Sequence, residues 1–171
     1  MPVTGHGDLF DRAAVHIRPV DTIYDIGAGI RPQPFFKAAR HVCIEPHDEY
    51  AEWLEQHDYP VLRRTAFAAL PLAPPVETIF LLDVIEHMPK LVGLDVIKMA
   101  HARATRQIVV FTPLGFNEQS YGAGEKDRWG MNGGYWQTHR SGWEPEDFPG
   151  WTIIEDPAFH GSFGAFFAIH G

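Results

Sequence analysis

Strand-like apolar runs alternate with segments of helical period over most of this 171-residue chain. The strand-like runs lie at about 22–27, 41–46, 60–65, 78–82 and 107–113, and the helical segments at about 8–18, 31–40, from 48 onward, and 90–105. Parallel strands need long crossover connections, which are usually helices. We therefore predict an α/β fold with one mostly parallel sheet between two layers of helices.

The last third of the chain departs from this alternation. Residues 117–140 are rich in glycine and polar groups and show no period, so we expect one long loop there, of the kind that often forms a lid. A brief helix capped by Ser141 and two strands, at about 151–156 and 164–171, should follow. Residues 66–77, rich in alanine and proline, should form an irregular connection.

Length and composition restrict the possible functions. A chain of this length with 45% hydrophobic residues fits one domain, spanning residues 1–171. The net charge of −8 and the lack of a basic cluster argue against a nucleic-acid or acidic-membrane partner. No apolar run is long enough to cross a bilayer and the first residues do not resemble a signal peptide, so we expect a cytoplasmic protein.

A glycine turn follows the first predicted strand in the stretch TIYDIGAGIRPQPFF, residues 22–36. Gly27 and Gly29 would let a ligand approach the main chain at the strand end. Glu45 ends the next strand, where a carboxylate can accept hydrogen bonds from ribose hydroxyls. Pro32 stands where a dinucleotide-binding turn has its third glycine. These residues alone fit either a ligand site or a tight turn beside a solvated acid.

The strand that starts at Thr78 runs into DVIEHM, which brings Asp83, Glu86 and His87 to the same sheet edge. Together, YDIGAG, IEPH, DVIEHM and VVFTP resemble the ordered motifs of the class I S-adenosylmethionine-dependent methyltransferases. The resemblance implies a single Rossmann-like α/β/α domain whose last strand runs antiparallel. It also implies S-adenosylmethionine as the cofactor and methyl transfer as the activity.

The resemblance further implies roles for individual residues. The residues around the cofactor would be Asp25, Gly27, Ala28 and Gly29 beside the methionine moiety, Glu45 at the ribose, and Asp83, Val84 and Ile85 at the methionine end. Where the family often has an acid that binds the adenine, this chain has none, so backbone groups and apolar contact at Ala66 and Phe67 would hold that ring. The sulfonium and ammonium cations of this cofactor suit a rim that carries three acids. A pyrophosphate would instead need bare helix N–H groups and a third glycine.

Two histidines are the candidate catalytic residues. Histidine titrates near neutral pH and can accept the proton of a hydroxyl or ammonium acceptor. The resemblance directs His87 toward the methyl group or the acceptor, and His139 lies in the polar, aromatic tail of the predicted loop, with His160 as a further candidate. His41 and His47 lack the spacing of a shared metal site, so we expect no bound metal.

The acceptor is expected to be a small molecule, such as a sugar, a lipid precursor or a secondary metabolite. DVIEH is not the Asn-Pro-Pro-aromatic motif of the methyltransferases that act on nucleic-acid bases, and the acidic charge points the same way. Two alternatives remain. The first is an NAD- or nucleotide-sugar-binding Rossmann enzyme, for which the chain lacks a Tyr-x-x-x-Lys pair. The second is a domain of this fold that binds the cofactor without transferring the methyl group.

Overall fold

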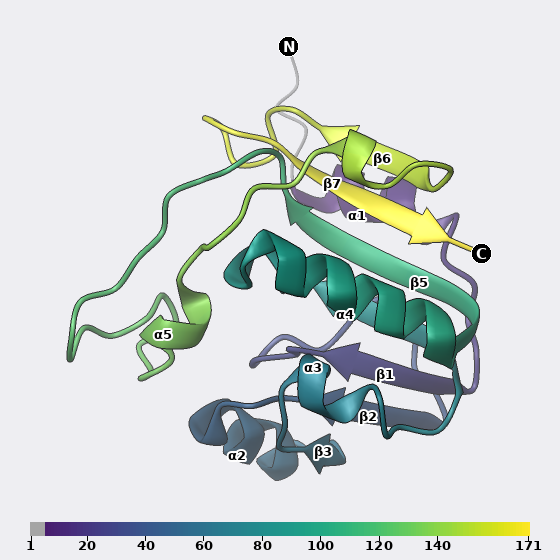
Figure 1. Ribbon diagram of the computed structural model, residues 1–171, viewed down its shortest axis with the longest axis horizontal. Coiled ribbons are helices and arrows are strands. Elements are labelled where there is room, and N and C mark those ends of the chain that lie inside the picture. Colours follow the sequence, from purple (N-terminus) through teal and green to yellow (C-terminus); the bar gives the residue numbers. More distant parts are fainter. Residues whose placement is uncertain (1–5) are drawn as a thin grey trace.

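The most apolar strand-like run forms β4 (Val76–Leu82), which lies inside the sheet of the computed structural model. The structure describes residues 6–171, and Figure 1 shows their arrangement. β4 pairs in parallel with β1 (Thr22–Ile26) on one side and with β5 (Ala104–Pro113) on the other. Because all three strands are buried on both faces, they read as continuous apolar runs rather than as alternating patterns.

The remaining strands extend both edges of this central part. β2 (Arg40–Ile44) and β3 (Val61–Leu62) continue the parallel pairing beyond β1. β7 (Ala165–His170) runs antiparallel to β5 and pairs with β6 (Thr152–Asp156). Within the described residues the strand order is β3-β2-β1-β4-β5-β7-β6. The predicted sheet, mostly parallel with an antiparallel last strand, is confirmed.

Helices cover both faces of this sheet. α1 (His6–Ala14) packs in a cluster with Phe80 on one face, whereas α4 (Lys90–Arg103) packs in a cluster with Ile79 on the other. Neighbouring residues of a strand point to opposite faces, so Ile79 and Phe80 of the same strand separate the two clusters. α2 (Asp48–Gln56) packs beside β2 and β3. The predicted three-layer α/β/α architecture is therefore confirmed.

The predicted helix at 31–40 is wrong, because this crossover between β1 and β2 is irregular. Pro32 and Pro34 remove two backbone donors, and a proline disfavours helical dihedrals in the residue before it. The side chain of Gln33 replaces the helical hydrogen bonds. Its Oε1 accepts from the backbone N–H of Phe35 at 2.9 Å, and its Nε2 donates to the carbonyl of Phe36 at 2.6 Å.

Two smaller expectations also fail. Residues 66–77 begin with a short helix, α3 (Ala66–Ala69), because Thr65 Oγ1 accepts from Ala68 N–H at 3.2 Å and caps it. Ser141 does not cap a helix. The remaining short elements are the turns η1 (Ile85–His87) and η2 (Pro145–Asp147) and the helix α5 (Gly134–Gln137) within the predicted loop.

Trp143 joins the end of the long loop to α4. Its side chain is fully buried, and its Nε1–H donates to Ser141 Oγ at 2.9 Å. Ser141 Oγ in turn donates to the carbonyl of Ile85 at 3.1 Å. Gly93 on α4 makes room for the indole, because a Cβ at that position would lie 2.5 Å from Trp143 Cζ2. Trp143 thus packs the segment that follows the long loop against α4.

We expect Trp143→Ala to lower the free energy of unfolding by about 3–5 kcal/mol, the usual cost of removing a large buried aromatic side chain. Chemical denaturation measures this change. Leu91→Ala is the matched control, because Leu91 lies on α4 with 77% of its side chain exposed and should change stability by less than about 0.5 kcal/mol. Similar losses in both variants would contradict the packing role of Trp143.

Candidate functional site

The strand order reverses between β1 and β4, and the carboxyl ends of these two strands form the edge at which α/β sheets bind ligands. The glycine turn follows β1 at this edge. Gly27 and Gly29 have positive φ angles of 61° and 56°, which favour glycine. A Cβ on Gly27 would lie 2.9 Å from a methyl carbon of Val84, and one on Gly29 would lie 2.7 Å from the ring of Trp129. The turn is therefore closely packed on both sides.

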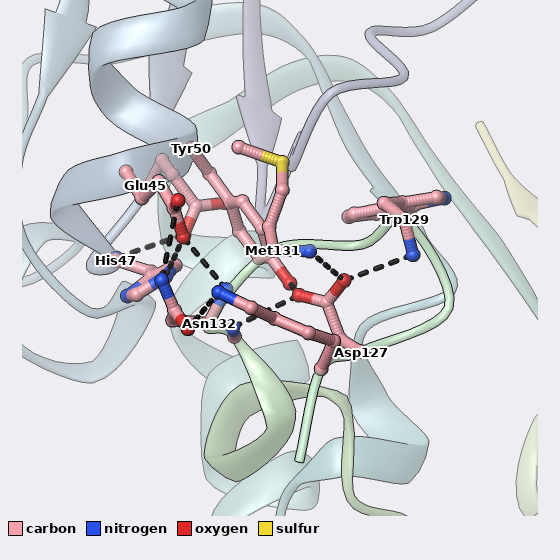
Figure 2. A network of polar contacts seen from close by, with 10 residues as sticks. Glu45, His47, Tyr50, Asp127, Trp129, Met131 and Asn132 are labelled. Atoms are coloured by element: carbon pink, nitrogen blue, oxygen red, sulfur yellow. Dashed lines mark hydrogen bonds and ion pairs between the residues drawn. The ribbon is translucent and has the colours of Figure 1, made fainter. Parts of the chain in front are cut away.

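Glu45 at the end of β2 ties the neighbouring backbone together. It is 3% exposed, its Oε2 accepts from Gly29 N–H at 2.9 Å, and its Oε1 accepts from His47 N–H at 2.9 Å (Figure 2). Burial raises the pKa of Glu45 to about 7, and the two backbone hydrogen bonds limit that rise. Each carboxylate oxygen keeps a second lone pair for a ligand.

Asp83 follows β4 and carries the positive φ of 54° that is rare outside glycine. Such strain is frequent at functional sites. The surface of Asp83 stays accessible from the cavities around it. The surrounding protein nevertheless displaces bulk water and raises the pKa of Asp83 to about 6. A hydrogen bond with Glu86 and the charges of Arg128 and Arg31 lower the pKa and limit this rise. Burial also raises the pKa of Glu86 well above its ordinary value.

Two pockets open at this sheet edge. The first pocket, of about 250 Å³, includes Gly27, Gly29, Glu45, Ala66, Phe67, Asp83, Val84, His87, Tyr50, Tyr135, Trp136 and Gln137 among its lining residues. The second pocket, of about 440 Å³, includes Gly27, Ala28, Arg31, Asp83, Glu86, His87, Arg128, Trp129 and Gln137. Asp83 and His87 line both, so the two pockets meet at the motif that follows β4.

The long loop at 117–140 lies across the ends of the strands, and Figure 1 shows it on the same side as α2. The carboxylate of Asp127 organises its centre. Trp129 N–H and Met131 N–H donate to Asp127 Oδ1 at 2.9 and 3.0 Å, and Gly133 N–H donates to Oδ2 at 2.9 Å. The hydroxyl of Tyr50 on α2 also donates to Oδ2 (Figure 2).

These contacts attach the loop to α2. Burial by itself would raise the pKa of Asp127, but its hydrogen bonds from Tyr50 and from backbone amides outweigh burial and hold the pKa below its ordinary value. A further contact runs from Asn132 N–H to Glu49 Oε2 on α2 at 2.7 Å. The attachment brings the ring of Trp129 over Gly29, so the loop forms a wall of the second pocket.

The two candidate catalytic histidines lie beside each other, with ring centroids 5.0 Å apart. His87 Nδ1 is 3.3 Å from the carbonyl of Thr138, and His139 Nδ1 is 2.6 Å from the carbonyl of Asn117. A carbonyl only accepts, so in both rings Nδ1 carries the proton and Nε2 keeps its lone pair. Burial lowers the pKa of His87 to about 4 and also lowers the pKa of His139.

Most of the predicted site residues line one of the two pockets, and three of them do not. Eight of them line the first pocket: Gly27, Gly29, Glu45, Ala66, Phe67, Asp83, Val84 and His87; Ala28 lines the second. Asp25, Ile85 and His139 line neither of these two. Asp25 Oδ2 accepts from Gln33 N–H at 2.7 Å and bonds His41 Nε2 at 2.9 Å, so it supports the turn from behind. Ile85 is fully buried in the core.

Sequence reasoning did not single out several residues that the structure brings to the pockets. They are Tyr50, Arg128, Trp129, Tyr135 and Gln137. Four of them belong to the long loop, whose mixed aromatic and polar composition indicated function without indicating which side chains face inward. Tyr50 lies on an amphipathic helix, where an inward aromatic residue looks the same whether it fills a core or binds a loop.

Arg31 lines the second pocket and faces both an aromatic ring and an acid. Its guanidinium carbon lies 5.9 Å from the ring centroid of Trp129, and its charge lowers the pKa of Asp83. Arg128 acts on Asp83 in the same direction. The second pocket therefore contains both acids and cations, and neither sign dominates.

Comparison with solved structures identifies the fold. The complex of DhpI with S-adenosylhomocysteine superposes with a TM-score of 0.66 at 10% identity, over 95% of this chain and 81% of that one. The class I methyltransferase fold is present here. The sheet with its antiparallel β5-β7-β6 end is the arrangement that this fold has in common. The sequence itself matches no protein-family model and no curated protein.

Other methyltransferase structures share the fold over nearly the whole chain. Magnesium protoporphyrin IX methyltransferase from Synechocystis PCC 6803 with bound S-adenosylhomocysteine has a TM-score of 0.60 at 14% identity, over 95% of this chain and 79% of that one. The N-methyltransferase NodS from Bradyrhizobium japonicum WM9 has a TM-score of 0.62 at 11% identity, over 96% and 92%. These proteins act on different acceptors, so the likeness establishes the fold and leaves the acceptor open.

Within residues 6–171, none of the helices combines the length and the apolar character that crossing a bilayer requires.

We expect Asp127→Ala to release the centre of the loop, because four hydrogen bonds lose their common acceptor. Hydrogen exchange of the amides at 129–133 should accelerate by about 10- to 100-fold, the equivalent of about 1.5–3 kcal/mol for bonds to a charged group. Tyr50→Phe removes only one of the four bonds and should have a smaller effect. Unchanged exchange in Asp127→Ala would show that the loop is held by other contacts.

Proposed function

We propose that this chain transfers a methyl group from S-adenosylmethionine to a small-molecule acceptor. The observation that carries the proposal is the position of Glu45 at the first pocket, hydrogen-bonded to the glycine turn at Gly29 N–H. A carboxylate that ends β2 beside such a turn suits two ribose hydroxyls. The shared fold with structures that contain S-adenosylhomocysteine supports the same assignment.

The chemistry of the first pocket fits this cofactor. Phe67 is half-exposed at its edge and offers an apolar face to a purine ring, next to the small side chain of Ala66. Asp83 contributes a carboxylate at the opposite end, where positive charge is stabilised. When it is bound, S-adenosylmethionine supplies an electrophilic methyl group. The residues of the chain bind and orient the reactants and exclude water.

The irregular crossover after β1 argues against the dinucleotide alternative. A pyrophosphate binds to the bare N–H groups at the start of a helix, and the described chain has no helix between Gly29 and β2. Pro32 and Pro34 also remove donors from this segment. A cofactor with cationic groups needs acids and close approach to the backbone, which this turn provides.

We assign the acceptor to the second pocket. Asp83 and His87 border both pockets, so a group held in the second pocket would face the methyl-donor end of the first. His87 Nε2 and the carboxylate of Asp83 accept hydrogen bonds there and can orient a hydroxyl or an amine. The loop residue Trp129 covers this side, where its ring would help to exclude water from the bound acceptor. The pocket size and the net charge of −8 favour a sugar, a lipid precursor or a secondary metabolite over a nucleic acid.

Calorimetry with S-adenosylhomocysteine tests the cofactor assignment, and NAD is the competing ligand. We expect binding of the sulfur ligand and none of NAD. Glu45→Ala should weaken the binding of S-adenosylhomocysteine by about 1.5–3 kcal/mol, because charge-assisted hydrogen bonds are lost. Glu52→Ala is the matched control, since Glu52 is an exposed carboxylate on the neighbouring α2. Heat from NAD alone would favour the dinucleotide alternative.

The raised pKa of Glu45 predicts a pH dependence of cofactor binding. Only the ionised carboxylate accepts hydrogen bonds from both ribose hydroxyls, and burial raises its pKa to about 7. Affinity for S-adenosylhomocysteine should therefore rise as the pH increases from 6 to 8, roughly one unit on each side of that pKa. Glu45→Gln should bind more weakly and lose this rise. An unchanged pH profile in Glu45→Gln would assign the titration to another group.

The same ionisation has the opposite effect on the unliganded protein. The folded pKa of Glu45, about 7, lies above the ordinary value of 4.5, so the folded state holds its proton more tightly than the unfolded state. Between pH 4.5 and about 7 the unfolded state binds fewer protons than the folded state, so the free energy of unfolding falls as the pH rises. Stability and cofactor affinity should therefore change in opposite directions across this range.

A cofactor-binding domain without transfer is the remaining alternative. It predicts the same calorimetric result for S-adenosylhomocysteine but no methylated product from any acceptor. Incubation with radiolabelled S-adenosylmethionine and a panel of hydroxylated and amine-bearing small molecules separates the two.

A further inference from the structure

We propose that Glu86, His87 and His139 bind a divalent transition-metal ion at the wall of the second pocket. One donor atom from each residue lies within 4.8 Å of the other two, and His87 Nε2 lies 3.9 Å from Glu86 Oε1. Two imidazoles and one carboxylate on one side of an ion leave its other positions open. Glu86 and His87 line the second pocket, so those positions can face it.

Each histidine is held as a metal ligand requires. A ligating ring needs a lone pair on one nitrogen, and its other nitrogen usually donates to a carbonyl or a carboxylate that fixes its orientation. His87 and His139 both direct Nδ1 to backbone carbonyls, at 3.3 Å from Thr138 O and 2.6 Å from Asn117 O. Both Nε2 atoms therefore keep their lone pairs.

Glu86 shows the same arrangement. Its side chain is 2% exposed, and Thr112 Oγ1 donates to its Oε2 at 3.2 Å. This hydrogen bond leaves Oε1 on the side of His87 Nε2. A carboxylate buried beside two neutral imidazoles has no cation to pair with among these three residues, whereas a metal ion would pair with it and occupy the lone pairs of both rings.

The backbone locks the two segments that supply the ligands. Arg140 N–H and Ser141 N–H both donate to the carbonyl of Glu86, at 2.7 and 3.1 Å. These bonds join the residues directly after His139 to η1. His139 N–H donates to Gln119 O at 2.8 Å and fixes the other side of the loop. The three donors are therefore held together by contacts that do not depend on an ion.

The donor set selects the kind of ion. Imidazole nitrogen suits zinc, iron, cobalt and other first-row transition metals, whereas magnesium and calcium prefer oxygen ligands and waters. Arg31 and Arg128 line the same pocket and offset the charge of Asp83. Attraction to this site must therefore come from coordination by nitrogen more than from net negative charge, which again favours a transition metal.

An ion in this position would lower the pKa of a hydroxyl bound to it and hold that oxygen beside Asp83. This role rests on the proposed function, but binding of the ion does not. His87 and His139 would then act as metal ligands rather than as the general bases that their sequence positions suggested. The ion would take the lone pair of His87 Nε2, so the ion and Asp83 would orient the acceptor in place of His87.

The test uses the full chain after removal of metal by a chelator. Titration with Zn²⁺ in a calorimeter, and with Co²⁺ while its absorption spectrum is recorded, should show one equivalent bound and a spectrum typical of nitrogen and oxygen ligands. His139→Ala and His87→Ala should each weaken binding by more than about 100-fold, beyond the range for loss of an outer hydrogen bond. Thr112→Val, which keeps the ligands, should weaken it by about 10-fold.

Two controls locate the ion. His57→Ala removes an exposed histidine and should change nothing. His41→Ala tests the group formed by Asp25, His41 and Cys43, whose donor atoms also lie within 4.8 Å of one another. Loss of binding in His41→Ala with full binding in His139→Ala would overturn the proposal, and so would the absence of any bound equivalent. Thermal unfolding of each variant checks the fold, and a glutamine variant at the same position replaces any alanine variant that fails to fold.

The outcome is independent of cofactor binding. Zinc binding without binding of S-adenosylhomocysteine would support the metal site and contradict the proposed function. The reverse result would contradict the metal site alone.

Discussion

The carboxylate of Asp127 is the interaction on which the site depends, because it fixes a loop that has almost no regular structure. Three backbone amides of the loop and the hydroxyl of Tyr50 converge on its two oxygens. Irregular backbone can stay in one conformation only when its polar groups find partners, and here one side chain accepts three backbone N–H groups. Through Tyr50 the loop is bound to α2, and Trp129 is brought over the glycine turn at Gly29.

The balance of charge at the strand ends follows from the attachment of the loop to α2. Glu45 and Glu86 are buried and the surrounding protein displaces bulk water from Asp83, so the pKa values of all three carboxyl groups are raised. Arg31 comes from the crossover and Arg128 from the loop, and both stabilise the ionised form of Asp83. Acids that would repel one another at an open sheet edge therefore remain together beneath the loop, where the proposed cationic cofactor or metal ion would find oxygen ligands without a strongly charged surface.

The prolines of the crossover illustrate how a local signal can be read two ways. Pro32 and Pro34 are compatible with the first turn of a helix, and the hydrophobic residues around them suggested one. Whether a helix forms depends on partners distant in sequence. Gln33 satisfies the backbone of this segment with its own side chain, while Phe35 lies 6.0 Å from Phe80 of β4, ring centroid to ring centroid. The crossover between β1 and β2 is therefore stabilised by tertiary packing, which the pattern of apolar residues in the sequence does not reveal.

The sequence by itself determined the mostly parallel sheet and the acids at the strand ends, because apolar runs such as β4 and their βα spacing depend on local chemistry and chain length. The order of the strands within the sheet came from the structure. The sequence also indicated that 117–140 is a loop and that Glu45 and Asp83 lie near the glycine turn. Only the tertiary structure decided which loop residues face the pockets and that Glu86, His87 and His139 converge. His139 is separated from His87 by 51 intervening residues of sequence. Their proximity depends on the loop's hydrogen bonds to α2 and η1, which are contacts between residues distant along the chain.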